Sequence, residues 1–211
     1  MGRSSSPAWR VARAVMALAI VVALVTQLVL ASDNPLFSPF NFFSYFTVLS
    51  NLSAVVVLSM LAVRPGQTRG FDVWRGASTL YMTVTLLVYV TVLLPLETDV
   101  GVSEPWIDWI IHGIGPLFMV VDWAVNRPAG PISRSDFGKW LIFPAVYLVY
   151  TLIRGPVVDW YPYPFLDPRP PHSYGEVVVG SVIVLLAILL IGSALRWWAN
   201  RATEPVGTDA T

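Results

Sequence analysis

Six long apolar stretches most constrain the fold of this chain, because each is about long enough to cross a membrane as a helix. They cover roughly residues 12–31, 42–63, 73–94, 106–125, 138–154 and 176–198. A helix needs about 20 mostly apolar residues to cross a hydrocarbon core roughly 30 Å thick. Only 12% of the 211 residues are charged, whereas soluble domains carry about 25%. The sequence therefore predicts an all-α polytopic membrane bundle with six transmembrane helices in one domain, residues 1–198.

The fifth stretch is the weakest, since Pro144 interrupts its apolar run, and alone it also fits a re-entrant segment. Charge placement favours a full crossing, because cytoplasmic loops carry an excess of Lys and Arg. With six crossings and a cytoplasmic N-terminus, only Arg154 and Arg169 fall outside. The other eleven basic residues fall inside: Arg3, Arg10, Arg13, Arg64, Arg69, Arg75, Arg127, Arg134, Lys139, Arg196 and Arg201. We therefore expect both termini in the cytoplasm and the protein in the cell's plasma membrane.

Two features of the termini complete this layout. Val29 and Ala31 suit a signal-peptide cleavage site, but the apolar stretch from Ala14 to Ala31 exceeds the usual core of about 7–15 residues. A retained first helix is the favoured interpretation. Residues 199–211 are mostly small and polar, which predicts a disordered cytoplasmic tail.

Composition narrows the possible functions. The chain has no cysteine and two histidines, His112 and His172, so thiol chemistry is excluded and a histidine-rich metal site lacks ligands. The formal net charge is zero, so nothing argues for nucleic acid. We expect no cofactor and no metal. The expected partners are membrane lipid and a lipid-like small molecule, and the oligomeric state stays open.

The fourth span carries the ionisable residues His112 and Asp122, and such groups inside a membrane are often functional. Asp122 lies near the inner end, where Arg127 or another basic residue is expected to pair with it. Pro116 removes the usual helical partner of the residue 112 carbonyl, so the helix should kink or open there. Asp108, one turn outward, is placed to orient the His112 ring. A histidine bonded to a neighbouring helix without any chemistry is the alternative.

Polar side chains also gather at the outer side of the membrane. Asn41, Ser44, Thr47 and Asn51 fall within a narrow stripe at 100° per residue, which should face the bundle interior. Such a stripe is also typical of interhelical hydrogen bonding. In the third span Tyr81, Thr85 and Tyr89 share a face, which we interpret as helix–helix contact.

The loop between the last two spans holds six prolines from Pro156 to Pro171, which should prevent a helix there. Its aromatic residues suit a lid at the headgroup level, with Asp159 and Tyr161 as candidate site residues.

Depth relates the second span to the fourth. Thr47 lies about five residues into its span and His112 about six, or roughly 7 and 9 Å below the outer side. An alcohol becomes a good nucleophile when a base within about 3 Å takes its proton. Matched depth permits that contact, while the lateral distance stays open.

Several strings resemble a bacterial family of six-span membrane proteins: FNFFSYFTVLSNL, the HxxxP of the fourth span, Asp122–Trp123, and YTLIRG followed by WYPYPFLDP. The resemblance covers about residues 10–198. That family is more distantly similar to the animal androgen-induced-gene family, which includes the androgen-dependent regulator of tissue factor pathway inhibitor. Its members are membrane threonine hydrolases of fatty-acid esters of hydroxy fatty acids. The resemblance implies Thr47 as nucleophile and His112 as the catalytic histidine.

Two functions follow as hypotheses. One is an intramembrane lipid-ester hydrolase, a carboxylic-ester hydrolase with Thr47 as nucleophile and His112 as general base. Asp108, Ser44, Asn51, Pro116, Asp159 and Tyr161 would support its pocket. The other is a non-enzymatic multi-pass membrane protein, either a small-solute or proton pathway or a scaffold.

Overall fold

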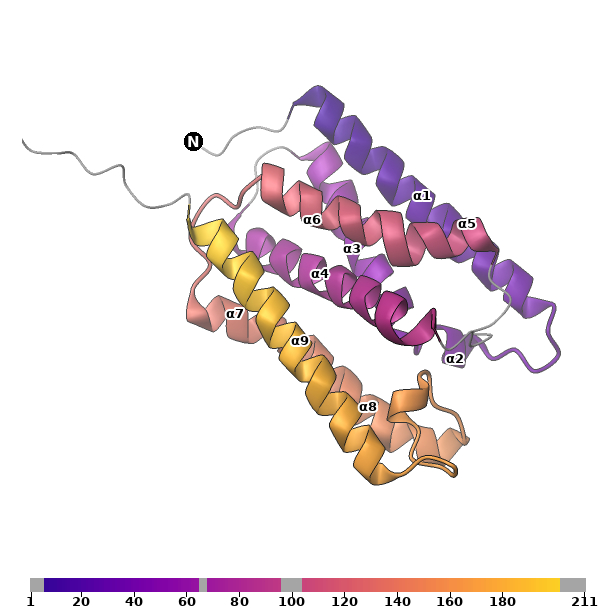
Figure 1. Cartoon of the computed structure of the whole chain (residues 1–211). Helices are drawn as coiled ribbons and strands as arrows, with labels where there is room; N and C mark the ends of the chain where they lie inside the picture. The colour runs from indigo at the N-terminus through magenta and orange to yellow at the C-terminus, as the bar shows by residue number, and fades with distance from the viewer. Residues whose placement is uncertain (1–5, 65–67, 96–103, 202–211) are drawn as a thin grey trace, which may run out of the picture.

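The computed structural model describes residues 6–64, 68–95 and 104–201. All of the regular elements in these residues are helices (Figure 1). Six helices are long and apolar enough to cross a membrane, as the sequence predicts. In chain order they are α1 (Pro7–Ser32), α3 (Phe46–Val63), α4 (Arg69–Val88) continued by the π-helical η1 (Tyr89–Leu93), α5 (Pro105–Asp108) with the π-helical η2 (Trp109–Ile114) and α6 (Gly115–Val125), α7 (Arg134–Trp140) with α8 (Ile142–Val158), and α9 (Tyr174–Asn200). Two short elements, α2 (Pro39–Phe42) and the 3₁₀ turn η3 (Pro164–Leu166), lie between them.

Several boundaries differ from the predicted ones, and the first, third and fifth spans begin four or five residues earlier, at Pro7, Arg69 and Arg134. The second span begins at Phe46 rather than near Phe42, because the chain turns after α2 before α3 starts. Asn41 therefore belongs to α2 and not to the polar stripe of α3. The proline-rich loop begins later than predicted, since α8 continues through Pro156 to Val158. The sixth span extends to Asn200, so the start of the predicted tail is helical, and residues 202–211 lie outside the described residues.

The fourth span opens at His112, as Pro116 led us to expect. The helix is α-helical up to Asp108, π-helical from Trp109 to Ile114, and α-helical again from Gly115. Proline has no N–H, so the register beside it must change, and a π-helical turn is one solution. The third span also ends in a π-helical turn, η1, which the sequence gave no reason to expect.

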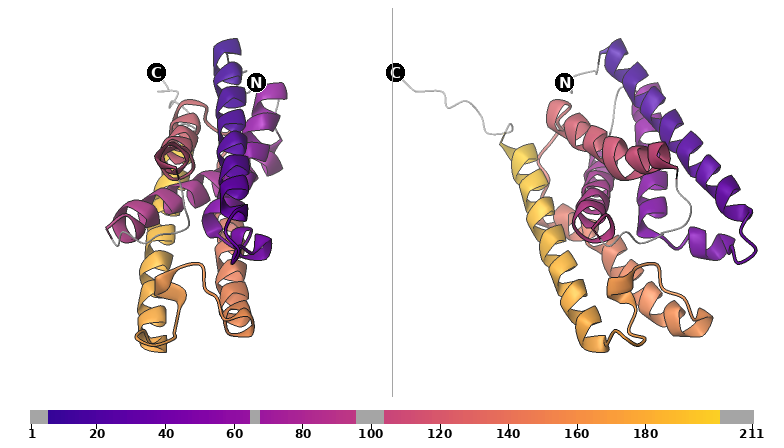
Figure 2. Two further views of the ribbon diagram at one scale, coloured as in Figure 1. Left: turned by 90° about the vertical axis from the view of Figure 1, so that its right-hand side faces the viewer. Right: turned by 45° about the vertical axis from the view of Figure 1, so that its right-hand side comes forward.

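Helix α4 lies at the centre of the bundle and packs against α3, α6, α7 and α9. Helices α1 and α3 pack side by side, and the fourth span completes this half of the molecule. The start of α1 and the end of α9 lie at the same end of the bundle (Figures 1 and 2), as an even number of crossings requires. That end is the predicted cytoplasmic side.

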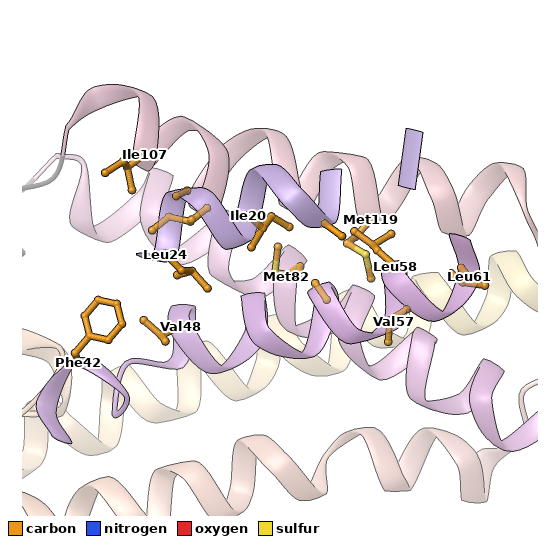
Figure 3. Close-up of a cluster of buried hydrophobic side chains, with 14 of the residues drawn as sticks. Ile20, Leu24, Phe42, Val48, Val57, Leu58, Leu61, Met82, Ile107 and Met119 are labelled. Carbon is orange, nitrogen blue, oxygen red and sulfur yellow. The ribbon is translucent and has the colours of Figure 1, made fainter. Parts of the chain in front are cut away.

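A buried apolar cluster joins α1, α3, α4 and the fourth span (Figure 3). Ile20, Leu58 and Met82 have 0% of their surface exposed and come from three different helices. Lipid tails are as apolar as these side chains, so close packing rather than water exclusion must hold the helices together. This half of the protein is therefore the tightly packed half.

A cluster of buried charges, which we call the inner clamp, ties α1, α4 and α6 near the cytoplasmic side. Asp122 accepts hydrogen bonds from the Arg13 Nε at 2.7 Å, from the Arg75 Nε at 3.1 Å and from the Trp9 Nε1 at 2.8 Å. The predicted ion pair of Asp122 is confirmed, with partners from α1 and α4. Arg127 instead stacks on the Trp198 ring. Both carboxylate oxygens of Asp122 are thus bound to arginine.

Candidate functional site

A cavity of about 470 Å³ lies between α4, α8 and α9 in the outer half of the bundle. Ligand cavities in proteins usually measure about 300–1,000 Å³. The described side chains that line it are apolar or uncharged: Phe46, Thr47, Val84, Thr85, Val88, Leu93, Leu141, Pro144, Ala145, Tyr147, Leu148, Leu152, Tyr163, Phe165, Leu166, Val177, Val178, Ser181, Val182, Val184, Leu185 and Ile188. We call this space the outer cavity.

The loop between α8 and α9, residues 159–173, roofs the outer cavity with Tyr163, Phe165 and Leu166. Glycines let it rest directly on the two helices. A Cβ at Gly155 of α8 would lie 2.1 Å from the Tyr161 ring, and one at Gly180 of α9 would lie 3.2 Å from Phe165. The loop is therefore docked on both of the helices that flank it, which agrees with the predicted lid.

Arg169 fastens this roof on its outer side. Its guanidinium donates to Asp159 and to Asp167, each at 2.6 Å, and stacks on the Tyr161 ring. The Asp159 side chain is 87% exposed, so this predicted site residue holds the roof and does not line the outer cavity. Arg169 holds the pKa of the Asp167 carboxyl below its usual value.

Thr47 lies at the second position of α3, and its side chain lines the outer cavity. Its Oγ1 is 3.4 Å from the Tyr163 hydroxyl, and its backbone N–H donates to the same hydroxyl at 3.3 Å. Burial raises the pKa of Tyr163, so its phenol stays protonated and is a hydrogen-bond donor rather than a base. Thr47 and Tyr163 thus form a hydroxyl pair at the outer end of the cavity.

Ser44 connects the start of α3 to α8. Its hydroxyl donates to the Phe40 carbonyl at 2.6 Å and bonds the Tyr150 hydroxyl at 2.8 Å, while the Tyr147 hydroxyl donates to the Ser44 carbonyl at 2.9 Å. Ser44 is buried but does not line the outer cavity. It positions Thr47 by holding the chain three residues earlier.

Asn51 links Thr47 to the π-helical turn of the fourth span. Its Nδ2 donates to the Thr47 carbonyl at 2.9 Å and to the Ile111 carbonyl at 3.0 Å. The backbone turns of Thr47 and Ile111 are therefore neighbours, so the predicted match in depth between these spans is confirmed. Within the described residues the Asn51 Oδ1 has no hydrogen-bond partner.

His112 lies beside Asp108 and Tyr89. Its Nδ1 is 3.2 Å from the Asp108 Oδ1, although the pair lacks the geometry of a hydrogen bond. Its ring stacks on Tyr89 with centroids 4.3 Å apart and planes 5° apart. His112 does not line the outer cavity, and the described residues show no hydrogen bond between His112 and Thr47. The structure brings together His112 with Asp108, and Thr47 with Tyr163.

The remaining supporting residues have structural contacts. Pro116 is buried at the start of α6, where it follows the π-helical turn. The Tyr161 ring lies against Gly155 and beneath Arg169, on the roof rather than inside the outer cavity. Three of the polar residues predicted to face the bundle interior, Ser44, Thr47 and Asn51, are buried.

Sequence reasoning missed three residues of the site. Tyr163 is one of the aromatic residues of the predicted lid, and its distance from Thr47 along the sequence gives no signal of contact. Tyr89 and Thr85 share one helix face with Tyr81, and the sequence predicts helix–helix contact for that face. Tyr89 instead stacks on His112, and Thr85 lines the outer cavity. Tyr81, whose hydroxyl donates to the Trp140 carbonyl at 3.0 Å, makes the predicted helix–helix contact, and the stack of Tyr89 on His112 also joins two spans.

Comparisons with known proteins do not add a family. No family model, no curated protein and no solved structure matches the chain. Across residues 6–64, 68–95 and 104–201, no three His, Asp or Glu side chains gather as metal ligands would. The chain is therefore identified by its structure as a multi-pass membrane protein with a cavity.

Proposed function

We propose that this multi-pass membrane protein binds a lipid with a long apolar chain in the outer cavity. The observation that carries the proposal is the cavity itself, which lies within the membrane-spanning region and has apolar walls. Water in such a space finds few polar partners, whereas an acyl or alkyl chain finds close contacts with the apolar walls.

The position of the cavity supports entry from the membrane. Val178, Val182 and Leu185 of α9 line the cavity and are 62%, 48% and 49% exposed. The outer halves of α8 and α9 extend beyond the other spans (Figure 2). A lipid can therefore reach the cavity from its side, without passing through water.

The polar end of the cavity indicates the head group. The hydroxyls of Thr47 and Tyr163 offer both donors and acceptors, and none of the described lining residues carries a charge. Burying a charged head group without an opposite charge is costly. We therefore propose an uncharged head, such as an alcohol or an ester.

Binding is tested by filling the cavity. Val184→Phe replaces a lining isopropyl group with a bulkier aromatic ring. Val179→Phe makes the same change on α9 at a position that is 58% exposed and outside the cavity. With stearyl alcohol as probe, native mass spectrometry from detergent micelles should show lipid-bound protein for the wild type and Val179→Phe. Val184→Phe should lose most of that signal. Equal binding by all three proteins would refute the proposal.

Ester hydrolysis with Thr47 as nucleophile is the second candidate function. It is favoured by one observation, that the Thr47 hydroxyl borders the cavity while Asn51 joins its turn to that of His112. Thr47 Oγ1 would attack the ester carbonyl carbon, and His112 would take the hydroxyl proton and give it to the departing alkoxide. Water would then release the acyl group from Thr47. This reaction requires His112 to turn from Asp108 toward the cavity.

Hydrolysis is tested with methylumbelliferyl palmitate, a fluorogenic long-chain ester. Thr47→Ala should abolish release of the fluorophore, and His112→Ala should lower the rate by about 10²–10⁴-fold. Thr83→Ala removes a hydroxyl on α4 that does not line the cavity, so it should leave the rate unchanged. A rate in Thr47→Ala equal to that of the wild type would eliminate hydrolysis and leave lipid binding standing.

A further inference from the structure

A second polar point lies deeper in the outer cavity, on α4. Thr85 lines the cavity and is only 4% exposed, yet its hydroxyl has no hydrogen-bond partner among the described residues. An unpaired buried hydroxyl costs free energy, which a partner brought by a ligand would recover.

Other threonines of the same span show that a threonine in a helix does not generally lack a hydrogen-bond partner for its hydroxyl. The hydroxyls of Thr79, Thr83 and Thr91 each donate to the carbonyl four residues earlier, at 3.0, 2.7 and 2.7 Å. Such back-bonding is the usual solution for a threonine without another partner. Thr85 differs from these three in that it lines the outer cavity.

The surroundings of Thr85 place it below the polar end of the cavity. It precedes Tyr89 by one helical turn, or about 6 Å toward the cytoplasmic side. Tyr89 stacks on His112, whose turn lies beside that of Thr47. Its lining neighbours along α4 are Val84 and Val88, and Val184 and Ile188 line the cavity from α9. The Thr85 hydroxyl therefore lies among apolar neighbours on α4, whereas the other unpartnered lining hydroxyl in the described chain, that of Ser181, belongs to α9.

We propose that Thr85 recognises an oxygen atom carried part-way along the apolar chain of the bound lipid. This inference rests on the proposed lipid site and names its ligand class: an uncharged lipid with a carbonyl or hydroxyl within its chain. The Thr47–Tyr163 pair contacts the head, and Thr85 contacts the second oxygen. A free carboxylate does not fit either place, because no described lining residue bears a positive charge.

The test uses matched probes and matched variants. The probes are stearyl alcohol and the series of its analogues in which one chain methylene is replaced by a carbonyl. The first variant is Thr85→Val, which removes the hydroxyl and keeps the shape of the side chain. The control is Thr83→Val, the same change on a different face of α4 that does not line the cavity. Stearyl alcohol and one analogue, at equal concentrations, compete for each protein. Native mass spectrometry measures the ratio of the two complexes.

The wild type and Thr83→Val should prefer analogues with the carbonyl at one or two adjacent positions by about 3- to 10-fold, the worth of one hydrogen bond. Thr85→Val should lose that preference while still binding stearyl alcohol at least as well. Equal ratios for every analogue in the wild type, or a preference that survives in Thr85→Val, would overturn the role of Thr85 alone. Failure of the wild type to bind any probe would overturn the lipid site and this inference together.

Discussion

The half of the protein built from α1, α3 and the fourth span differs from the half built from α8 and α9. Of the residues in the most apolar window of each span, 28% are buried in α1, 44% in α3 and 39% in the fourth span, whereas the figure is 17% for the span of α7 and α8 and 17% for α9. The first half holds side chains such as Ile20 and Leu58 with no exposed surface, and the second surrounds a cavity of about 470 Å³. Apolar helices of similar composition thus form either a packed core or a binding space.

Buried polar groups in the inner clamp and at the outer cavity differ in whether they have hydrogen-bond partners. In the inner clamp Asp122 is held by two arginines and a tryptophan, so its charge is matched by direct partners. At the outer cavity Thr85 and Ser181 have buried hydroxyl oxygens without a partner in the described chain. Since an unsatisfied buried group costs stability, the difference separates a structural region from one suited to a ligand.

The largest effect should come from removing Asp122. Asp122→Ala leaves Arg13 and Arg75 buried without their shared carboxylate, which should lower the free energy of unfolding by about 3–5 kcal/mol. Denaturation in mixed micelles measures the change. Glu176→Ala, which breaks only the exposed pair with His172, should cost about 0–1 kcal/mol. Similar losses in the two variants would mean that the inner clamp does not hold the bundle.

The same truncation should cost different amounts in the two halves. Leu58→Ala opens a hole in the packed cluster and should destabilise the protein by about 2–5 kcal/mol. Leu148→Ala enlarges an existing cavity from a half-buried position, so its cost should be smaller, at about 1 kcal/mol. The two unfolding free energies, measured side by side, test the comparison. Equal costs would show that α8 packs as tightly as α3.

Docking of the roof is tested at Gly155. Gly155→Ala forces the new Cβ to within 2.1 Å of the Tyr161 ring, so the ring must move and the roof should loosen at a cost of about 1–3 kcal/mol. Gly138→Ala is the control, because its Cβ meets nothing within 4 Å. Limited proteolysis between α8 and α9 should accelerate in Gly155→Ala and not in Gly138→Ala. Unchanged proteolysis in both would argue against a roof fixed through Tyr161.

The smallest effect concerns pH. Because Arg169 lowers the folded-state pKa of Asp167, this pair stabilises the roof above the unfolded pKa of about 3.9. That contribution is lost as the pH falls below about 4 through the lowered pKa, and it should stay under about 1 kcal/mol at this partly exposed site. Proteolysis of the roof with an acid-active protease should therefore rise more steeply below pH 4 in the wild type than in Arg169→Gln. Parallel pH profiles would exclude the pair as a stabilising contact.

The candidate site was only partly predictable. Helix rise placed Thr47 and His112 at one level, and the bonds from Asn51 to both turns bear this out. The rise says nothing about direction, however, and Thr47 points to Tyr163 while His112 stacks on Tyr89. Tyr163 lies in a loop 116 residues away from Thr47, where no periodic pattern can indicate a contact.

The sequence by itself determined six crossings, the matching side of both termini and a break at Pro116, because apolar length, charge placement and proline chemistry are local properties. Only the tertiary structure decided that α8 and α9 leave a cavity and that Asp122 pairs with α1 and α4. It also decided that the Thr85 hydroxyl has no partner among the described residues while the neighbouring threonines do. These outcomes depend on how helices far apart in the chain fit together. In a membrane that fit is set by the shapes of side chains, which composition does not record.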